Sequence, residues 1–269
     1  MSPHSASLSA AAIASHRDAA TTATQVSIEV VAETGSTNAD LMARSAARTL
    51  ITPLLLVAEH QSAGRGRAGR SWLSAPGSSL TFSLAWRFTG SAQRLLGLPL
   101  AIGVAVADAL AAQGVQVQLK WPNDILKDGA KLAGILVETQ HDASANTTVA
   151  VIGIGLNLVM PDDLEQRIGR DVAAAPWLAR MDRNALLAAL LDHLAATLAA
   201  FDRGGFAAFA SRWNLLHGWA GQQVRIVDNG VVLQQGAAAG VDDSGRLLLD
   251  TDAGRVAIAA GDVSLRLAD

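Results

Sequence analysis

The first two thirds of the chain show short apolar runs that alternate with helical patterns. Branched and alternating apolar runs predict six strands, because strand side chains point to opposite faces in turn and central strands are apolar on both faces. These strands are expected at residues 26–31, 54–59, 79–88, 115–120, 131–139 and 147–158. Strands interleaved with helices are typical of a mixed α/β domain.

Helical patterns occupy several of the intervals between these strands. Ser36 is a predicted N-cap for the first helix, since a side-chain oxygen there can accept from the free N–H groups of the first turn. Residues 92–112 are apolar nearly all round and predict a buried helix. Two further helices are expected, a leucine-rich one capped by Asp182 or Asn184 and a shorter one over 206–216.

The pattern changes at Gly218. From residue 222 onward, short strands are separated by the turn sequences Asp228-Asn-Gly, Asp242-Asp-Ser-Gly and Asp252-Ala-Gly, which predicts a small β-barrel. The start of the chain is rich in Ala, Ser and Thr, which predicts a mobile tail or a frayed helix. We therefore expect a disordered or low-complexity tail over 1–25, an α/β domain over 26–217 and a small β domain over 218–269.

Composition narrows the classes of function. Half of the 269 residues are hydrophobic, which supports a substantial core, and the net charge of -3 disfavours a general nucleic-acid binder. Without cysteine the chain has no disulfide, thiolate metal site or cysteine nucleophile, and its six histidines show no pairing typical of zinc hydrolases. No apolar run predicts a membrane span and no basic leader precedes an apolar core, so a cytoplasmic location is expected.

The segment Gly64–Arg70 alternates glycine and arginine directly after a predicted strand. Glycine lets the backbone approach a ligand closely, and arginine offers a planar charged fork that matches phosphate or carboxylate oxygens. An anion clamp, an ordinary solvated loop and an RGG-like nucleic-acid contact all fit this spacing. Trp72 follows, and it fits either a stacking contact with a base or a place in the core.

A second polar cluster lies at neighbouring strand ends. Lys120 and Asn123-Asp124 close one predicted strand, Lys131 opens the next, and Asp128-Gly129 predicts a tight turn between them. These side chains are therefore expected close together. A lysine beside apolar residues often extends to solvent, but Gly134 leaves room for a ligand beside Lys131.

Together these motifs resemble the biotin–protein ligase family. The resemblance rests, in order, on Gly35–Asn38, Glu59–Gln61 with Gly64–Arg70 and Trp72, Lys120–Asp124, Lys131–Glu138 and Gly153–Asn157. It implies a mixed-sheet α/β (α+β), class II synthetase-like catalytic domain followed by a small SH3-like β-barrel. It also implies the monofunctional type, because a winged helix-turn-helix domain would need more than the residues before this region.

The resemblance implies roles for particular residues. Biotin is expected at Ser36, Thr37, Asn38, Gln61, Arg65, Gly66, Arg67, Lys131, Gly134 and Gly155, nucleotide at Arg67, Trp72, Asn123, Asp124, Lys131 and Asn157, and catalysis by Arg67, Lys131 and Asp124. No certain metal ligand is implied. Residues 161–181, where the family can place an aromatic residue over adenine, show no pattern that aligns, and Trp177 is left out for that reason.

The implied reaction uses ATP with Mg²⁺ to activate biotin as biotinyl-5'-AMP, then transfers biotin to a lysine of a biotin carboxyl carrier protein. The resemblance leaves room for a homodimer and implies neither DNA nor membrane as a partner. An ionised carboxylate attacks phosphorus without a protein base, so cationic groups that relieve charge crowding are sufficient. Asp124 is the candidate to assist the acceptor amine in the second step.

Three alternatives remain open. A lipoate or octanoate attachment enzyme would use related chemistry, although Gly64–Arg70 with Trp72 favours biotin. A nucleic-acid module would use the basic loop, against which the net charge of -3 speaks. A non-catalytic biotin binder is disfavoured by Arg67 and Lys131.

Overall fold

The computed structural model describes residues 7–18, 25–159, 161, 173–176, 178–261 and 263–268. A seven-stranded mixed sheet carries most of the chain, in the order β1-β2-β3-β7-β6-β5-β4. Its strands are β1 Ser27–Thr34, β2 Leu54–Gln61, β3 Ser79–Thr89, β4 Gln118–Lys120, β5 Asp124–Lys127, β6 Ala130–Asp142 and β7 Thr147–Asn157. Only the β1–β2 pairing is parallel within this sheet.

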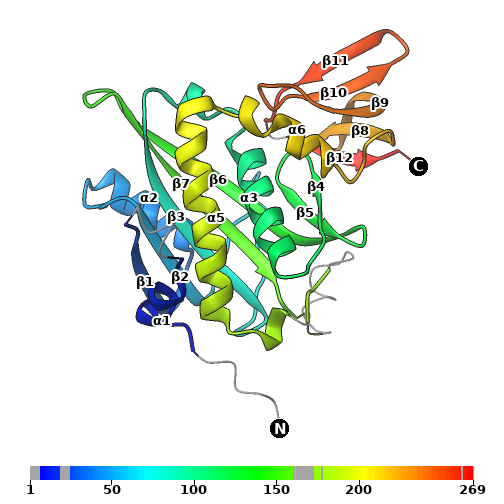
Figure 1. Cartoon of the computed structure of the whole chain (residues 1–269). Helices are drawn as coiled ribbons and strands as arrows, with labels where there is room; N and C mark the ends of the chain where they lie inside the picture. The colour runs from blue at the N-terminus through cyan, green and yellow to red at the C-terminus, as the bar shows by residue number, and fades with distance from the viewer. Residues whose placement is uncertain are drawn as a thin grey trace.

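Helices cover both faces of this sheet (Figure 1). They are α1 Ala10–His16, α2 Thr37–Ala46, η1 Ala92–Leu95, α3 Leu98–Ala112, η2 Leu178–Arg180, α5 Arg183–Gly204 and α6 Ala207–Leu215. Leu55 of β2 belongs to the larger core with α3 and α5, whereas its neighbours Leu54 and Leu56 pack with Leu41 of α2. Alternate residues of a strand point to opposite faces. Thus α2 lies on one face of the sheet, and α3 and α5 lie on the other.

The structure divides the predicted helix over 92–112 into η1 and α3. Gly97 separates them with φ +78°, and a Cβ at this glycine would lie 2.6 Å from the Cβ of Phe206. Pro99 then occupies the first turn of α3, where its missing N–H costs no intrahelical bond. The single predicted helix is wrong at its start, because the chain turns there and passes close to Phe206.

The predicted turn between the two lysine strands is confirmed, but an additional strand separates them. Asp128 and Gly129 have φ of +51° and +81°, as a tight hairpin turn requires. This turn joins β6 to the short strand β5, which pairs with β4 through Lys120 and Asp124. The strand predicted over 115–120 is shorter than expected, since β4 begins at Gln118.

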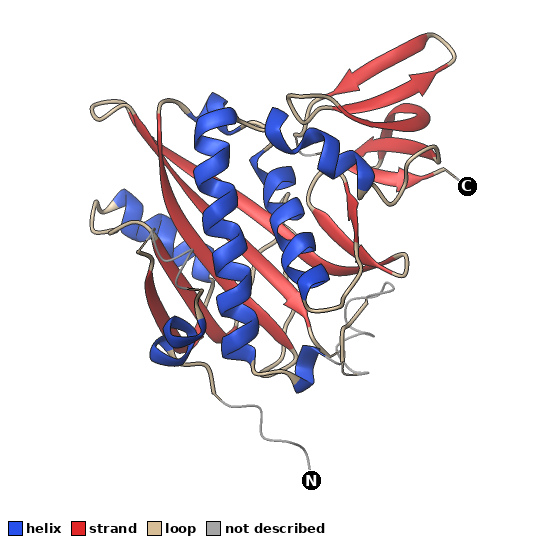
Figure 2. Cartoon of the chain, in the orientation of Figure 1, coloured by secondary structure: helices blue, strands red, loops and turns tan. Residues whose placement is uncertain are grey.

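A second sheet forms the C-terminal part of the chain (Figure 2). Its five antiparallel strands run in the order β11-β10-β9-β8-β12, with β8 Gln223–Asp228, β9 Val231–Val241, β10 Leu247–Thr251, β11 Gly254–Ile258 and β12 Ser264–Leu267. Asn229 and Gly230 both have positive φ, which confirms the predicted turn. The indole of Trp121 donates to the carbonyl of Gly245 at 3.1 Å, so the two sheets are joined by a direct hydrogen bond.

The N-terminal segment differs from the predicted mobile tail. Residues 7–18 contain α1, which packs on α5 and buries Ile13 completely. Arg17 forms a nearly buried ion pair with Asp192 at 2.8 Å, and Ser9 caps the helix. A seven-residue helix has little stability by itself, so this packing and pairing with α5 hold it. Of the two alternatives predicted for this segment, residues 7–18 contradict the mobile tail and contain a helix, which is packed on α5, whereas 1–6 and 19–24 lie outside the described residues.

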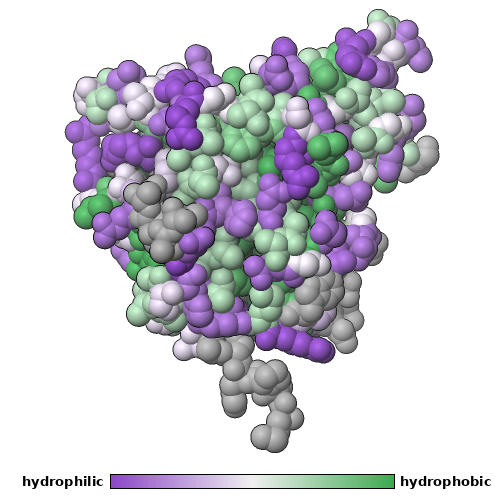
Figure 3. Space-filling view, viewed as in Figure 1, coloured by the Kyte–Doolittle hydropathy of each residue, from purple (hydrophilic) through white to green (hydrophobic). Residues whose placement is uncertain are grey.

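Two helical regions, 92–112 and 183–204, are long and apolar enough to cross a membrane by composition alone. Both are 67% buried inside the protein over their most apolar window. They lie side by side across the sheet, and the face above them mixes hydrophilic and hydrophobic residues (Figure 3). This burial is typical of core helices in a soluble protein.

His217 marks the junction between the two sheets and should make stability pH-dependent. Burial lowers its pKa to about 4, its ring packs 4.8 Å from that of Trp213, and neither ring nitrogen has a hydrogen-bond partner among the described residues. Because the unfolded histidine binds its proton near pH 6.5, stability is full above that pH and decreases as pH falls toward 4.

We expect this histidine to lower the free energy of unfolding on the order of 2 kcal/mol between pH 7 and pH 5. Urea unfolding at both pH values should show that loss in the unmodified chain and a smaller one in His217→Phe. An equal loss in both proteins would show that the junction histidine does not titrate in this way.

Candidate active site

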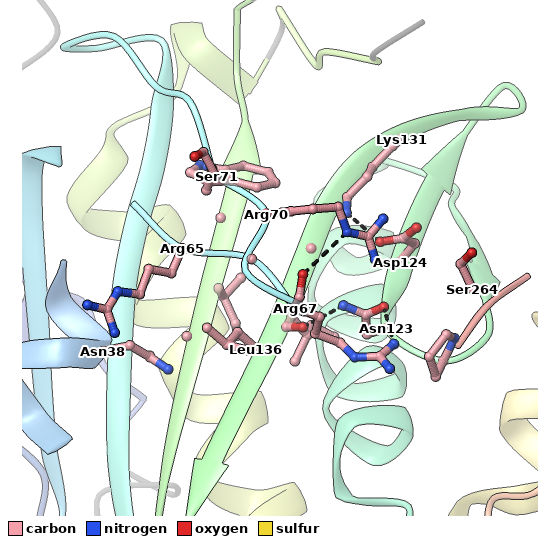
Figure 4. A pocket seen from close by; sticks show the side chains of 18 of the residues that line it. Asn38, Arg65, Arg67, Arg70, Ser71, Asn123, Asp124, Lys131, Leu136 and Ser264 are labelled. Atoms are coloured by element: carbon pink, nitrogen blue, oxygen red, sulfur yellow. Dashed lines mark hydrogen bonds and ion pairs between the residues drawn. The ribbon is translucent and has the colours of Figure 1, made fainter. Parts of the chain in front are cut away.

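A pocket of about 880 Å³, open mouth included, lies on the α2 face of the large sheet. Its walls come from the start of α2, the end of β2 and the loop after it, the first half of β3, the segment that joins β4 to β5, parts of β6 and β7, and the start of β12 (Figure 4). Segments far apart in the sequence therefore meet at one cavity.

Small residues on the central strands make room for the pocket. Gly153 and Gly155 of β7 face it. Gly134 of β6, which pairs with Gly155, faces it as well. A Cβ on Gly153 would lie 2.4 Å from Oδ1 of Asn38, and a Cβ on Gly155 would lie 2.3 Å from Cε2 of Trp72. The glycines thus let the Asn38 amide and the Trp72 indole rest directly on the sheet.

The loop after β2 is a small hairpin folded across the pocket. Trp72 donates its backbone N–H to Gly64 at 2.9 Å, and Gly66 donates to Arg70 at 2.6 Å. A Cβ on Gly64 would lie 2.6 Å from the carbonyl oxygen of Trp72, so glycine is required where the two arms meet. The glycines therefore allow a compact hairpin, and the arginines between them extend their guanidinium groups from it.

Arg67 at the tip of this hairpin reaches two other parts of the chain. Its Nη1 donates to Oδ1 of Asn123 at 3.2 Å, and its Nη2 donates to the carbonyl of Gly261 next to β12. The Asn123 amide in turn donates to the carbonyl of Ile135 at 2.7 Å, which fixes its orientation. One arginine thus links the loop, the β4–β5 turn and the C-terminal sheet.

Two lysines and one carboxylate form the charged wall of the pocket. Lys131 Nζ lies 2.5 Å from Oδ1 of Asp124, and Lys120 Nζ lies 3.4 Å from Oδ2. Burial would raise the pKa of Asp124, but the adjacent lysines outweigh it and hold the pKa below its usual value. Burial lowers the pKa of Lys120, and Asp124 only partly compensates. This wall holds one more cation than anion, which suits a negatively charged ligand.

The opposite end of the pocket is lined by neutral hydrogen-bonding groups. Thr37 donates its backbone N–H to Oε1 of Gln61 at 2.8 Å, and its hydroxyl lies 2.7 Å from that of Ser83. Ser83 donates to Oδ1 of Asn38 at 2.6 Å, and Nδ2 of Asn38 donates to Oε2 of Glu138 at 2.8 Å. The hydroxyl of Ser36 is used as the N-cap of α2, 3.4 Å from the N–H of Ala39.

The structure brings nearly all the residues expected at the site to this one cavity. Its lining includes Ser36, Thr37, Asn38, Gln61, Arg65, Gly66, Arg67, Trp72, Asn123, Asp124, Lys131, Gly134 and Gly155. Asn157 is the exception: it is buried beside the cavity and donates to the carbonyl of Ala173 at 3.3 Å. Trp177 lies outside the described residues.

Several residues at the site were missed by the sequence. Ser83 lines the cavity from β3, and Glu138 supports it from outside the lining. Residues 263–266 reach it from the C-terminal sheet. The alternation along β3 places Ser83 on the same face as Thr81, which is a weak indication that Ser83 belongs to the site. No local pattern connects residues 263–266 to a site so distant in sequence.

The side chains that line the cavity indicate how a metal ion could be held there. Among the described residues no group of three or more His, Asp or Glu side chains is placed to hold one. Asp124 is the acidic residue in the described lining, and lysines contact both of its oxygens. These residues fit a magnesium ion that arrives with nucleotide phosphates and keeps water ligands better than an ion held by the protein alone.

Gly155→Ala should disrupt the site without unfolding the protein. A methyl group placed 2.3 Å from the Trp72 ring must displace that ring, and with it the adjoining arm of the hairpin. We expect a change in tryptophan fluorescence and, for the biotin that the sequence resemblance implies as the ligand, at least a tenfold weaker affinity, corresponding to about 1.4 kcal/mol. The control is Gly204→Ala at the end of α5, where a Cβ would have only an ordinary contact at 3.7 Å. Equal behaviour of the two variants would contradict the role assigned to this glycine.

Comparisons with known proteins agree with the site. A model described as "Biotin/lipoate A/B protein ligase family" matches residues 31–157, a description that joins two kinds of ligase. A second model, "Biotin protein ligase C terminal domain", matches residues 220–266. The biotin–[acetyl-CoA-carboxylase] ligase of Mycobacterium tuberculosis is 37% identical over 245 residues, which are 88% of each chain. The chain belongs to the biotin protein ligase family.

Other members of the biotin protein ligase family show how far the similarity extends. The bifunctional ligase/repressor BirA of Escherichia coli is 36% identical over 220 residues, which are 79% of this chain and 66% of BirA. The chain thus spans about two thirds of that relative. Among solved structures, the biotin protein ligase from Aquifex aeolicus in complex with biotin and ATP has a TM-score of 0.74 at 27% identity, with 90% and 99% of the two chains covered. The expected architecture, a mixed α/β domain followed by a small antiparallel β domain, is confirmed.

Proposed function

We propose that the chain is an ATP-dependent biotin–protein ligase that forms biotinyl-5'-AMP and transfers biotin to one lysine of a biotin carboxyl carrier protein. The observation that carries this proposal is that Arg67 and Lys131 lie at one end of a cavity whose other end carries neutral polar groups, with Arg65 near Asn38. A charged wall suits phosphate and carboxylate, and a polar end suits the ureido ring of biotin. We also propose a catalytic domain over residues 26–217 and a small β domain over 218–269, the bounds that the sequence pattern predicts.

In the first step a carboxylate oxygen of biotin attacks the α-phosphorus of ATP. A carboxyl–phosphate bond forms, the bond to the leaving pyrophosphate breaks, and no proton transfer is needed. The reaction crowds negative charge, so Lys131, Arg67 and Arg65 serve to position the anions and lower their repulsion. Magnesium bound to the phosphates would supply further charge neutralisation. The assignment of Trp72, Asn123 and Asn157 to the nucleotide remains part of this proposal.

In the second step the acceptor amine attacks the carbonyl carbon of the adenylate. An amide bond forms, AMP leaves with the electrons of the broken bond, and the proton of the amine passes to solvent water. Asp124 is the proposed hydrogen-bond acceptor for that amine. Its lowered pKa keeps it ionised at neutral pH, so it orients the amine and is a poor base.

Three further proposals concern the acceptor protein, the cellular location and the oligomeric state, and each rests on fewer observations. Relatives named biotin–[acetyl-CoA-carboxylase] ligase favour a carboxylase carrier domain as the acceptor. The net charge of -3 favours a role without DNA, and consumption of ATP favours the cytoplasm. Two copies would pair through an edge of the large sheet, where β1 contacts only β2 among the described strands. Light scattering after gel filtration tests the homodimer.

The proposal is tested by incubating the chain with biotin, ATP and Mg²⁺ and searching for biotinyl-5'-AMP by mass spectrometry. A parallel reaction with lipoate distinguishes the related ligases, whose family model covers residues 31–157 as well. We expect the biotin adenylate and no lipoyl adenylate. Exclusive formation of the lipoyl product would overturn the proposed substrate.

A further inference from the structure

A line of hydrogen bonds runs from the pocket to a carboxylate outside it. It passes from Thr37 to Ser83, then to Asn38, and ends at Glu138 on β6, with donor–acceptor distances of 2.7, 2.6 and 2.8 Å. Thr37, Asn38 and Ser83 line the cavity and are buried, whereas Glu138 is half-buried and does not line it. Any effect of Glu138 on a ligand must therefore act through Asn38.

The carboxylate at the end of this line determines its direction. An ionised glutamate only accepts hydrogen bonds, so the Nδ2 group of Asn38 must face Glu138. The Oδ1 atom of Asn38 then faces Ser83 and receives its single hydroxyl hydrogen. The 2.7 Å contact between Ser83 and Thr37 then uses the hydrogen of Thr37, for which Oε1 of Gln61 at 3.1 Å is a second and more distant acceptor. Every donor in the line points toward Glu138.

This direction fixes what the pocket offers a ligand. Since the hydroxyl hydrogens of Thr37 and Ser83 are both committed, their remaining lone pairs can only accept. Gln61 receives the backbone N–H of Thr37 at Oε1, which leaves its Nε2 group beside Gly64 as a donor. The site thus has acceptors from two hydroxyl groups and a donor from one amide, which complements a cyclic urea with two N–H groups and one carbonyl.

We propose that Glu138 is a positioning residue that sets the hydrogen-bond polarity of the pocket, so that Thr37 and Ser83 accept from the ureido N–H groups of biotin. The inference deepens the proposed function and rests on it. Gly153 takes part in the same arrangement, because a Cβ there would lie 2.4 Å from the Asn38 oxygen and would displace the amide. Asn38 therefore acts by orienting Ser83, since both ends of its amide already have protein partners.

The experiment measures biotin binding by calorimetry without ATP in four variants of the full chain. In Glu138→Gln a carboxamide of nearly the same shape can present either end to Asn38, so the fixed direction is lost. We expect the Kd for biotin to rise about tenfold or more, because a donor then faces a donor in part of the molecules. At saturating biotin kcat should change little, and the KM for ATP should stay constant.

A compensating variant separates direction from mere shape. Asn38→Asp combined with Glu138→Gln moves the acceptor-only group to position 38, so the carboxamide at position 138 donates to it and Ser83 still donates to position 38, as in the unmodified chain. This double variant should recover most of the lost affinity, whereas Asn38→Asp alone places two carboxylates together and should bind weakest. The control is Glu33→Gln on β1, an exposed carboxylate outside the pocket lining. Thermal unfolding checks that each variant is folded.

The outcomes are distinct. Weaker binding in Glu138→Gln with recovery in the double variant supports the proposal. An unchanged Kd for biotin in Glu138→Gln overturns it. A double variant that binds biotin no more tightly than Glu138→Gln overturns it as well. Failure of the unmodified chain to bind biotin would instead overturn the proposed function.

Discussion

Replacing Lys131 by alanine should reduce adenylate formation by roughly 100- to 1,000-fold, the usual cost of removing one preorganised charge from a reaction centre. Lys131 ends 2.5 Å from Asp124 within the charged wall, and its removal leaves that carboxylate facing the incoming anions with Lys120 as the remaining cation of the wall. The expected result is slow pyrophosphate release with biotin and ATP, measured by a coupled phosphate assay.

The matched control for this variant is Lys127→Ala. Lys127 lies on the neighbouring strand β5, pairs with exposed Asp128 at the turn, and is outside the pocket lining. The control should release pyrophosphate at the unmodified rate. Normal release from Lys131→Ala would show that this lysine does not serve the first step.

Replacing Arg67 by glycine should convert the chain into an unselective biotinylating enzyme. Arg67 closes the hairpin onto Asn123 and onto the carbonyl of Gly261, so its loss frees the loop from two other segments at once. Each hydrogen bond from a charged group is worth roughly 1.5–3 kcal/mol, so the adenylate should dissociate about 10- to 100-fold faster. The released mixed anhydride then acylates exposed lysines of any protein nearby.

This second prediction is measured by labelling a mixture of unrelated proteins and detecting attached biotin. Arg67→Lys provides the comparison, because it keeps the charge but lacks the fork that reaches both partners. We expect broad labelling from Arg67→Gly, intermediate labelling from Arg67→Lys and labelling of the carrier alone from the unmodified chain. Tight adenylate and full selectivity in Arg67→Gly would contradict the clamp.

Local chemistry made much of the fold predictable. The turn at Asp128-Gly129 and the turn at Asn229-Gly230 need positive φ, which their residues adopt at low cost, and both occur as predicted. The central strands are apolar on both faces because helices cover both, so their sequence pattern was strong. The capping roles of Ser36 and Asp182 also follow from a contact within three residues.

What the sequence could not predict depends on distant contacts. The α1 helix is held by Asp192, 175 residues away, and its own composition resembles a tail. The break at Gly97 reflects the nearby side chain of Phe206. Glu138 contacts Asn38 across 100 residues, and Arg67 contacts Gly261 across 194. No periodicity or motif carries such pairings, because they arise only when the two sheets and their loops are assembled.

The central claim is that the hairpin arginines and Lys131 surround one anionic reaction centre that couples biotin to ATP. The most direct measurement is biotin-dependent exchange of labelled pyrophosphate into ATP, which requires reversible formation of the adenylate and no acceptor protein. The account predicts rapid exchange with biotin, none with lipoate, and exchange roughly 100- to 1,000-fold slower in Lys131→Ala. Exchange that does not depend on biotin, or that survives unchanged in Lys131→Ala, would contradict it.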